Sequence, residues 1–235
     1  MAEQIRVVLV DDQQLVRAGL AMVIAAQEDM VVVGEAGDGA EAVALVGRTG
    51  CDVVLMDVRM PGMDGLEATR RILAAADLAG QEQPPRIVML TTYDLDEYLL
   101  TAIRSGASGF LLKNAPPADL LGGIRTVHTG DAVIAPSATR RLLAHVAVGP
   151  DVAGAEDPRF ATLTDREREV LELIARGQSN AEISTSLFLS ETTVKTHVRR
   201  VLAKLGVRDR VQAVVAAYES GIARPGGNGQ VISPS

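Results

Sequence analysis

The chain has 235 residues, of which 47% are hydrophobic, and a net charge of -7 at pH 7. This length suits two compact domains, since one core usually organises roughly 100 to 150 residues. The composition excludes a wholly disordered chain, and no apolar run approaches the ~18 residues that a membrane helix needs. The N-terminus has no export-signal pattern and a single cysteine, Cys51, excludes an internal disulfide, so we expect a cytoplasmic protein without a membrane partner.

The charge is divided unevenly. Residues 1–128 hold 10 Lys and Arg against 18 Asp and Glu, a net of -8, whereas residues 160–235 hold 10 against 8, a net of +2. An acidic part joined to a mildly basic part indicates cation or phosphate chemistry in the first and an anionic partner for the second.

Residues 1–128 alternate short β-branched runs with longer helical patterns, which is typical of a parallel sheet with helices on both faces. The expected strands are Ile5–Val10, Met30–Glu35, Asp52–Met56, Arg86–Leu90 and Gly109–Leu112. The expected helices lie near 14–27, 39–48, 65–77, 95–105 and 117–128, with Asp94 and Glu97 spaced as a cap pair. The sequence therefore predicts a (βα)5 domain of the α/β class.

Residues 129–159 are expected to form a linker. Pro136–Val146 has the pattern of a short helix, and residues 148–158 are rich in Gly, Pro and acidic residues, which indicates flexibility. Residues 160–222 are expected to form a second, all-α domain, followed by a disordered tail, 223–235.

Helix signals divide this second domain. Thr164 and Glu167 form a capping box at the start of the first helix. The other expected boundaries are Gly177 at the end of the first helix, Asn180 as the N-cap of the second, Ser190 at the start of the third, and Gly206 at its end. The third helix has an apolar stripe on one side and, on the other, Thr192, Lys195, Thr196, Arg199 and Arg200. Such a face is suited to phosphates and base edges in the major groove of DNA, although the pattern alone also fits an ordinary solvated helix.

Polar residues follow the expected strands of the first domain at their carboxyl ends, which is the edge where ligands of open α/β sheets bind. In strand order they are Asp11 and Asp12, Asp57, Thr91, and Lys113. Any one of these aspartates could equally be a solvated loop residue or a helix cap. Three converging carboxylates, however, repel one another unless a cation neutralises them, and carboxylates with water suit Mg²⁺.

This first domain resembles the receiver domains of response regulators. The segments that carry the resemblance are, in order, VVLVDDQQLVRAGL, VVLMDVRMPGMDGLEATRRI, IVMLTTYD and GASGFLLKN. The resemblance covers about residues 5–128 and implies a flavodoxin-like fold. It also implies that Asp57 accepts a phosphoryl group from a phosphohistidine of a sensor histidine kinase, and that Mg²⁺ and Lys113 stabilise the transferred charge.

The same resemblance implies the remaining roles. Asp12 and Asp57 would ligate Mg²⁺ directly, Asp11 would act through water, and the backbone carbonyl of Arg59 would complete the protein ligands. Thr91 would bind the new phosphate and act as a switch with Phe110, which by itself also fits an ordinary core aromatic. Asn114 stands where many receivers have proline, which leaves open whether the peptide bond after Lys113 is cis.

The second domain resembles the LuxR-type helix-turn-helix over about residues 161–221, through the segment LTDREREVLELIARGQSNAEISTSLFLSETTVKTHVRRVLAKLGVRDR. The resemblance implies base contacts from Lys195, Thr196 and Arg199, with Thr193 and Arg200 nearer the phosphates. It also implies a fourth helix that starts at Arg208 and pairs with the same helix of a second subunit, as a homodimer on DNA. The residues expected at this dimer contact are Val211, Val214, Val215 and Tyr218.

Together the resemblances imply a NarL/FixJ-type response regulator. Phosphorylation of Asp57 would control dimerisation and binding to a double-stranded operator, and RNA polymerase would be a further partner. The chain would be no enzyme beyond its own phosphorylation and dephosphorylation. Three alternatives stay open: an aspartyl-phosphate phosphatase, an acyl-homoserine-lactone sensor, and a receiver that is never phosphorylated. The aspartate cluster and the absence of tryptophan oppose the second, and the complete set of site residues opposes the third.

Overall fold

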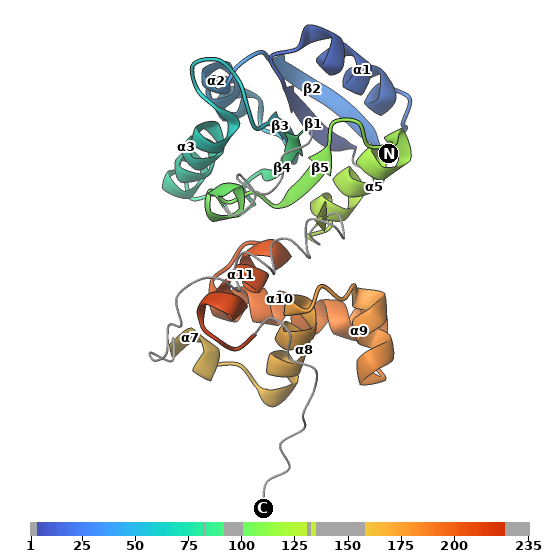
Figure 1. The fold of residues 1–235 in the computed structure, drawn as a ribbon, viewed down its shortest axis with the longest axis vertical. Helices are drawn as coiled ribbons and strands as arrows, with labels where there is room; N and C mark the ends of the chain where they lie inside the picture. Colours follow the sequence, from blue (N-terminus) through green and yellow to red (C-terminus); the bar gives the residue numbers. More distant parts are fainter. Residues whose placement is uncertain (1–3, 82, 92–100, 131–132, 135–157, 224–235) are drawn as a thin grey trace, which may run out of the picture. The chain divides into compact units, whose positions relative to one another are not determined.

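The structure is a computed structural model that describes residues 4–81, 83–91, 101–130, 133–134 and 158–223 (Figure 1). The chain divides into two compact units, Met1–Ala138 and Thr139–Ser235. Several expectations fall outside the described residues. They are the cap pair Asp94 with Glu97, the short helix Pro136–Val146, the flexible linker up to residue 157 and the tail from residue 224.

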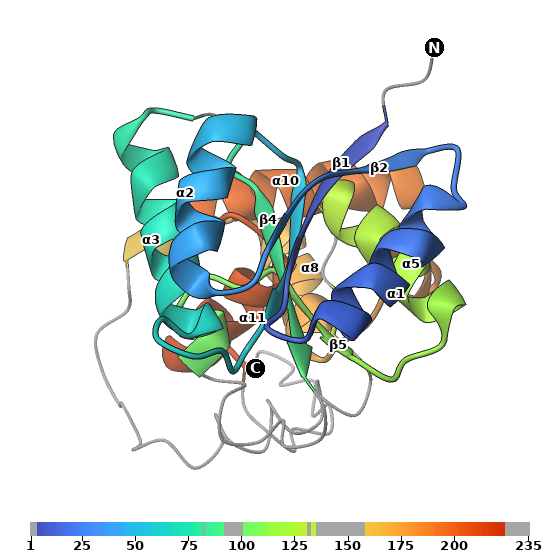
Figure 2. The ribbon, with the colours of Figure 1, turned by 90° about the horizontal axis from the view of Figure 1, so that it is seen from above.

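The first unit is a parallel sheet in the strand order β2-β1-β3-β4-β5-β6. Its elements are β1 (Ile5–Val10), α1 (Gln14–Ala25), β2 (Met30–Ala36), α2 (Gly39–Thr49), β3 (Val53–Asp57), α3 (Gly65–Leu78), β4 (Arg86–Thr91), β5 (Gly109–Leu112), α5 (Pro117–His128) and β6 (Val133–Ile134). Figure 2 shows α1 and α5 on one face of the sheet and α2 and α3 on the other. The predicted α/β fold is confirmed, with strand ends that differ from the prediction by at most one residue.

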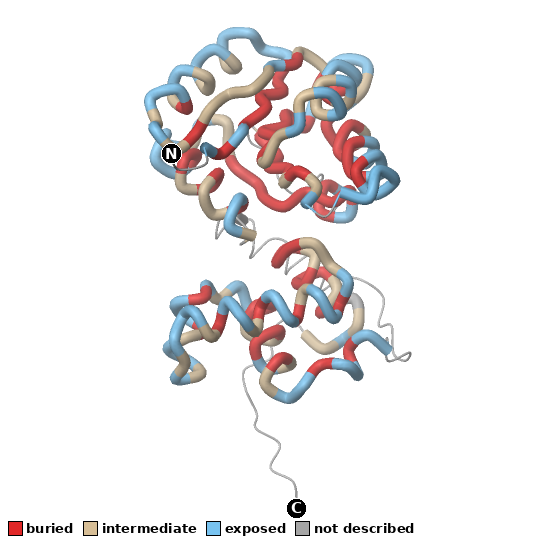
Figure 3. Tube along the Cα trace, turned by 180° about the vertical axis from the view of Figure 1, so that it is seen from behind, coloured by how far each residue is buried: buried red, intermediate tan, exposed pale blue. Residues whose placement is uncertain are grey.

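Burial on both faces explains the continuous apolar runs. All five residues of β3 are buried, and Figure 3 shows the buried central strands beneath helices whose outer sides are exposed. Alternate residues of β1, namely Ile5, Val7 and Leu9, belong to the core that also includes Leu120 and Ile124 of α5. This core fixes the strands, and therefore the carboxyl-end residues that follow them.

The sixth strand was not predicted. Val133 and Ile134 pair in parallel with Gly109 and Phe110 of β5, within the segment 129–159 that the sequence indicated to be a linker. Part of that segment thus extends the sheet. A two-residue strand is too short for a periodic signal, and its pairing satisfies backbone groups at the edge of β5. Of the expected fourth helix, residues 101–104 are helical and 95–100 lie outside the described residues.

The second unit is all-α. Its helices are α7 (Pro158–Ala161), α8 (Asp165–Ala175), α9 (Asn180–Leu187), α10 (Glu191–Leu205) and α11 (Arg210–Glu219). Four are the expected helices, and the short α7 is additional. Leu171, Val201, Leu205 and Ala213 lie in their common core. None of the helices that the structure describes is long and apolar enough to cross a membrane.

Two predicted helix starts were wrong by one or two residues. The N-cap of α9 is Ser179, not Asn180, because Ser179 and Glu182 form a complete capping box. The helix expected from Arg208 begins at Arg210, since the Asp209 side chain accepts from two backbone N–H groups. The capping box at Thr164 and the N-cap at Ser190 are as expected.

Candidate functional sites

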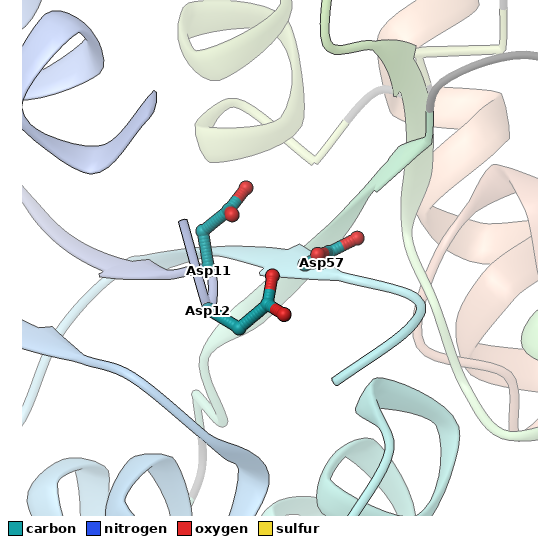
Figure 4. Close-up of side chains that lie close together, drawn as sticks. All are labelled: Asp11, Asp12 and Asp57. Carbon is teal, nitrogen blue, oxygen red and sulfur yellow. The ribbon is translucent and has the colours of Figure 1, made fainter. Parts of the chain in front are cut away.

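The three aspartates come together at the carboxyl ends of neighbouring strands. Asp11 and Asp12 follow β1 and Asp57 ends β3 (Figure 4). One carboxylate oxygen from each lies within 4.8 Å of the others. Asp11 and Asp57 are buried, whereas Asp12 is exposed. A buried carboxylate pair with an exposed third member is a donor set that fits a hard, partly hydrated cation such as Mg²⁺.

Lys113 places a positive charge against two of these aspartates. Its Nζ lies 2.6 Å from Asp11 Oδ2 and 2.6 Å from Asp57 Oδ2. Burial raises the pKa of the Asp57 carboxyl above its ordinary value, and the hydrogen bond from Lys113 opposes that effect. Burial lowers the pKa of Lys113, but its bonds to both aspartates outweigh burial and raise it overall. The ammonium therefore stays charged beside the carboxylates.

Two glycines allow close backbone approaches, one to Asp57 and one to the loop that follows it. A Cβ on Gly65, the first residue of α3, would lie 2.0 Å from the backbone oxygen of Asp57, and one on Gly39 would lie 2.5 Å from that of Met63. The Gly65 N–H donates to the Val58 carbonyl, which closes the loop after β3. The loop that follows the nucleophile candidate is thus held in a shape that only glycine permits at Gly65.

Arg17 is a residue of this site that the sequence did not indicate. Its guanidinium donates to the backbone carbonyl of Asp11, and its Nε lies 3.5 Å from Glu35 Oε2. The N–H of Gln13 donates to Asp11 Oδ1 at 2.9 Å. These contacts fix the turn that carries Asp11 and Asp12. The signal available in the sequence was one arginine on the first turns of an otherwise uncharged helix.

The expected switch residues occupy adjacent strands. Thr91 ends β4 half-buried, and its carbonyl accepts from the Lys113 N–H at 2.8 Å. Phe110 is only 2% exposed, so its ring already lies inside in this structure. The peptide bond between Lys113 and Asn114 is trans.

The cavity between α2 and α3 lies at the opposite edge of the sheet. It has a volume of about 410 Å³ and is lined by Arg6, Cys51 and Pro85 at the amino ends of strands, together with small residues of both helices. Burial raises the pKa of the Cys51 thiol to about 12, which favours the protonated thiol over the nucleophilic thiolate at neutral pH. The cavity lies at the amino ends of the strands and the carboxylate cluster at their carboxyl ends, so the two are separate features.

In the second unit, α10 presents the expected cationic face. Lys195, Thr196, Arg199 and Arg200 are exposed, while Val194, Val198 and Val201 are buried on the other side. Thr193 differs from the others because it is half-buried and its hydroxyl is 2.8 Å from that of Ser190. Four of the five proposed DNA-contact side chains are thus open to a ligand, and Thr193 takes part in the helix cap.

Two buried charged side chains, Glu167 and Arg210, bind polar groups of neighbouring helices. Lys204 Nζ lies 2.6 Å from Oε2 of Glu167, which also closes the capping box of α8. The hydrogen bond from Lys204, followed by that from the Thr164 backbone, lowers the pKa of Glu167 to about 2. Arg210, at the start of α11, is buried and donates to Asn180 Oδ1 at 3.0 Å. The helices on either side of α10 are therefore tied by polar contacts as well as by the apolar core.

The side chains expected to form a dimer contact are not free surface in this structure. Val211, Val214 and Val215 are buried. Tyr218 is half-buried, packs against the core and donates to the carbonyl of Ala175 at 3.3 Å. A dimer contact through α11 would require these side chains to become exposed, or would use other residues of the helix.

Two family models match the chain. Residues 7–125 match the response regulator receiver domain, and residues 161–217 match the bacterial regulatory proteins of the luxR family. An acidic receiver edge followed by a helix-turn-helix with a cationic helix defines a DNA-binding regulator. The chain belongs to the response-regulator family of two-component systems, in the NarL/FixJ-type class that joins these two domains. The lactone-sensor alternative is excluded, since its N-terminal half would differ.

Relatives match along nearly the whole chain. The uncharacterized transcriptional regulatory protein YxjL of Bacillus subtilis is 44% identical over 220 residues, which cover 94% of this chain and 98% of that protein. LiaR of the same organism is 39% identical over 216 residues, which cover 92% of this chain and 98% of LiaR. A structure of the RcsB response regulator of Salmonella typhimurium has a TM-score of 0.54 at 25% identity. The match covers 90% of this chain and 97% of the RcsB chain. YxjL and LiaR are described as transcriptional regulators and not as enzymes.

Proposed function

We propose that phosphorylation of Asp57 by a sensor histidine kinase controls sequence-specific DNA binding by α10, and thereby transcription. The observation that carries this proposal is the buried Asp57 carboxylate, 2.6 Å from Lys113 and grouped with Asp11 and Asp12 at the ligand-binding edge of the sheet. The proposed domains are a receiver over 1–128, a linker over 129–159 and a DNA-binding domain over 160–222. We also propose that the protein acts in the cytoplasm.

The proposed chemistry is transfer of a phosphoryl group from a kinase histidine to a carboxylate oxygen of Asp57. Asp12 and Asp57, with Asp11 through water, would hold Mg²⁺, and the Arg59 carbonyl would complete the protein ligands. Bound Mg²⁺ would supply neutralisation of charge on the phosphoryl oxygens. Lys113 is already placed against Asp57 to share that charge. The same residues would allow hydrolysis of the aspartyl phosphate, so the only turnover proposed is that of the receiver's own phosphate.

The proposed coupling uses Thr91 and Phe110. Thr91 would donate to the new phosphate, and the β4–β5 edge would rearrange with it. Because the Phe110 ring is already inside here, the unphosphorylated resting state would have to admit an outward position for a switch to operate. Phosphorylation would then shift a population between two receiver states, one of which favours a homodimer on DNA. A solved structure of RcsB contains two dimers bound to two parallel DNAs, and at 23% identity it shows only the fold for this chain. RNA polymerase is proposed as a further partner of the DNA-bound dimer.

A single variant tests the phosphorylation site. Asp57→Asn keeps the shape of the side chain but removes the nucleophilic carboxylate, so it should gain no phosphoryl group from a small-molecule phosphodonor in the presence of Mg²⁺. Mass spectrometry of the intact protein reports the added mass, and DNA binding with and without phosphodonor reports the coupling. Phosphorylation of the variant at the wild-type rate would exclude Asp57 as the acceptor.

A further inference from the structure

Phe188 combines two unfavourable features at the turn between α9 and α10. Its side chain is 96% exposed, more than the other large hydrophobic residues that are exposed in the described structure. Its backbone has φ 54° and ψ 45°, the left-handed conformation. Among the residues that the structure describes, it is the one non-glycine residue with a positive φ.

Folding does not account for a phenylalanine at this position. The left-handed conformation brings Cβ close to the following carbonyl oxygen, which is why helices commonly end in glycine there. This chain follows that rule elsewhere, with Gly177 after α8 and Gly206 after α10. An exposed ring also gains nothing from the hydrophobic effect. Glycine or asparagine at residue 188 would suit the isolated fold better.

The position of Phe188 in the motif indicates what the ring meets. In a helix-turn-helix the amino end of the second helix lies at the base edges, while the first helix crosses the DNA backbone. The turn between them therefore lies beside a DNA strand. Phe188 stands two residues before Ser190, the N-cap of α10, and Ser190, Thr192 and Lys195 are also exposed.

The backbone of the turn is held from both sides. The Leu189 N–H donates to the Ser184 carbonyl at 3.0 Å, and Arg166 Nη2 donates to the Leu187 carbonyl at 2.8 Å. The ring of Phe188 is thus presented from a fixed backbone, with no contact to its own domain that would reduce its exposure.

We propose that Phe188 is a DNA-contact residue whose ring packs against the deoxyribose edge of the strand that passes the amino end of α10. This inference rests on the proposed function of α10 as the DNA-binding helix. An apolar contact of this kind releases no counterion, so it adds affinity without adding salt dependence. It also explains why a residue that strains the turn is present there.

The test compares Phe188→Gly, Phe188→Asn and Phe188→Tyr in the full chain, with a fluorescently labelled, mixed-sequence DNA duplex as the probe. We expect the Gly and Asn variants to raise the Kd about tenfold, since much of the apolar ring contact is lost. Their Tm should be unchanged or higher. The Tyr variant should bind like the wild type, and the slope of log Kd against log salt should be the same for all three variants.

Two controls separate this inference from the function on which it rests. Leu78→Asn removes a side chain that is 90% exposed on α3, and its DNA affinity should not change. Arg200→Ala should weaken binding and lower the salt slope by about 1. If Arg200→Ala has this effect and Phe188→Asn binds like the wild type, the Phe188 contact is excluded while the DNA-binding face stands. If neither variant weakens binding, both are excluded. A parallel fall in Tm and affinity for both Gly and Asn would also overturn the inference, because Phe188 would then only support the turn.

Discussion

The acidic edge of the receiver and the cationic face of α10 place their charges in opposite settings. Asp11, Asp57 and Lys113 are buried and paired with one another, whereas Lys195 and Arg199 are exposed to solvent. Charges that stabilise a reacting phosphoryl group act best where water is excluded, since the local dielectric is low. Charges that meet a DNA backbone must remain accessible and be neutralised only on binding. Changes at the first region should therefore alter stability as well as function, and changes at the second should alter binding alone.

The largest expected effect is that of Lys113→Met. It leaves two buried carboxylates without their cation, so we expect the free energy of unfolding to fall by about 3 to 5 kcal/mol. Mg²⁺ should restore part of this loss, because a cation again neutralises Asp11 and Asp57. Urea denaturation with and without Mg²⁺ measures both effects. Arg125→Met, which removes an exposed ion pair with Asp29, is the matched control and should cost far less. Equal losses for the two variants would contradict a special role for buried charge.

The next largest effect is expected from Gly65→Ala, which fills the space beside the Asp57 backbone. Gly65→Ala places a Cβ only 2.0 Å from the Asp57 carbonyl oxygen, so we expect a loss of about 3 kcal/mol of stability and slower phosphorylation. Chemical denaturation measures the stability, and the rate of reaction with a phosphodonor measures phosphorylation. Gly122→Ala, on α5, meets no atom within 4 Å and should be neutral or stabilising. A Gly65→Ala protein as stable as the wild type would show that the loop after β3 can move aside.

Substitutions on the DNA-binding face of α10 should reduce DNA affinity and leave stability unchanged, in contrast to those at the receiver edge. Lys195→Ala and Arg199→Ala should each weaken operator binding by about 1 to 3 kcal/mol where a base contact is lost. The free energy of unfolding, measured by thermal denaturation, should stay within about 0.5 kcal/mol of the wild-type value, because both side chains are exposed. Binding isotherms on operator and random DNA distinguish loss of a base contact from loss of a phosphate contact. Isotherms identical to wild type for both variants would refute the assignment of α10.

The smallest expected effect is on stability, from loss of the ion pair between Lys204 of α10 and Glu167 of α8. The folded-state pKa of Glu167, about 2, is below its ordinary value of 4.5. The stability that it contributes is therefore complete above about pH 4.5 and is lost as the pH falls towards 2. Lys204→Met should remove about 1 kcal/mol at neutral pH and flatten this pH dependence. Thermal unfolding of the second domain between pH 2 and 7 measures the change. An unaltered profile in the variant would mean that the Glu167 capping contacts alone lower its pKa.

The sequence by itself determined the order of the elements and the residues that end the strands. Alternating apolar runs and helical patterns are local properties, so β1, β3, β4 and β5 could be placed nearly to the residue. The same holds for the capping box at Thr164 and the apolar stripe of α10. Asp57 could be identified because a carboxylate at the carboxyl end of a central parallel strand lies at the ligand-binding edge.

Only the tertiary structure decided which groups share a contact. The pairing of Lys113 with both Asp11 and Asp57, the hold of Arg17 on the Asp11 carbonyl, and the added strand β6 depend on segments far apart in sequence. The burial of the α11 valines depends on neighbouring segments as well, since an apolar stripe does not say whether its cover is a partner or the same chain. The left-handed backbone of Phe188 was equally hidden, because nothing in the local sequence requires it. Distances, burial and strain arise from packing, and packing is the part of the fold that a periodic pattern does not encode.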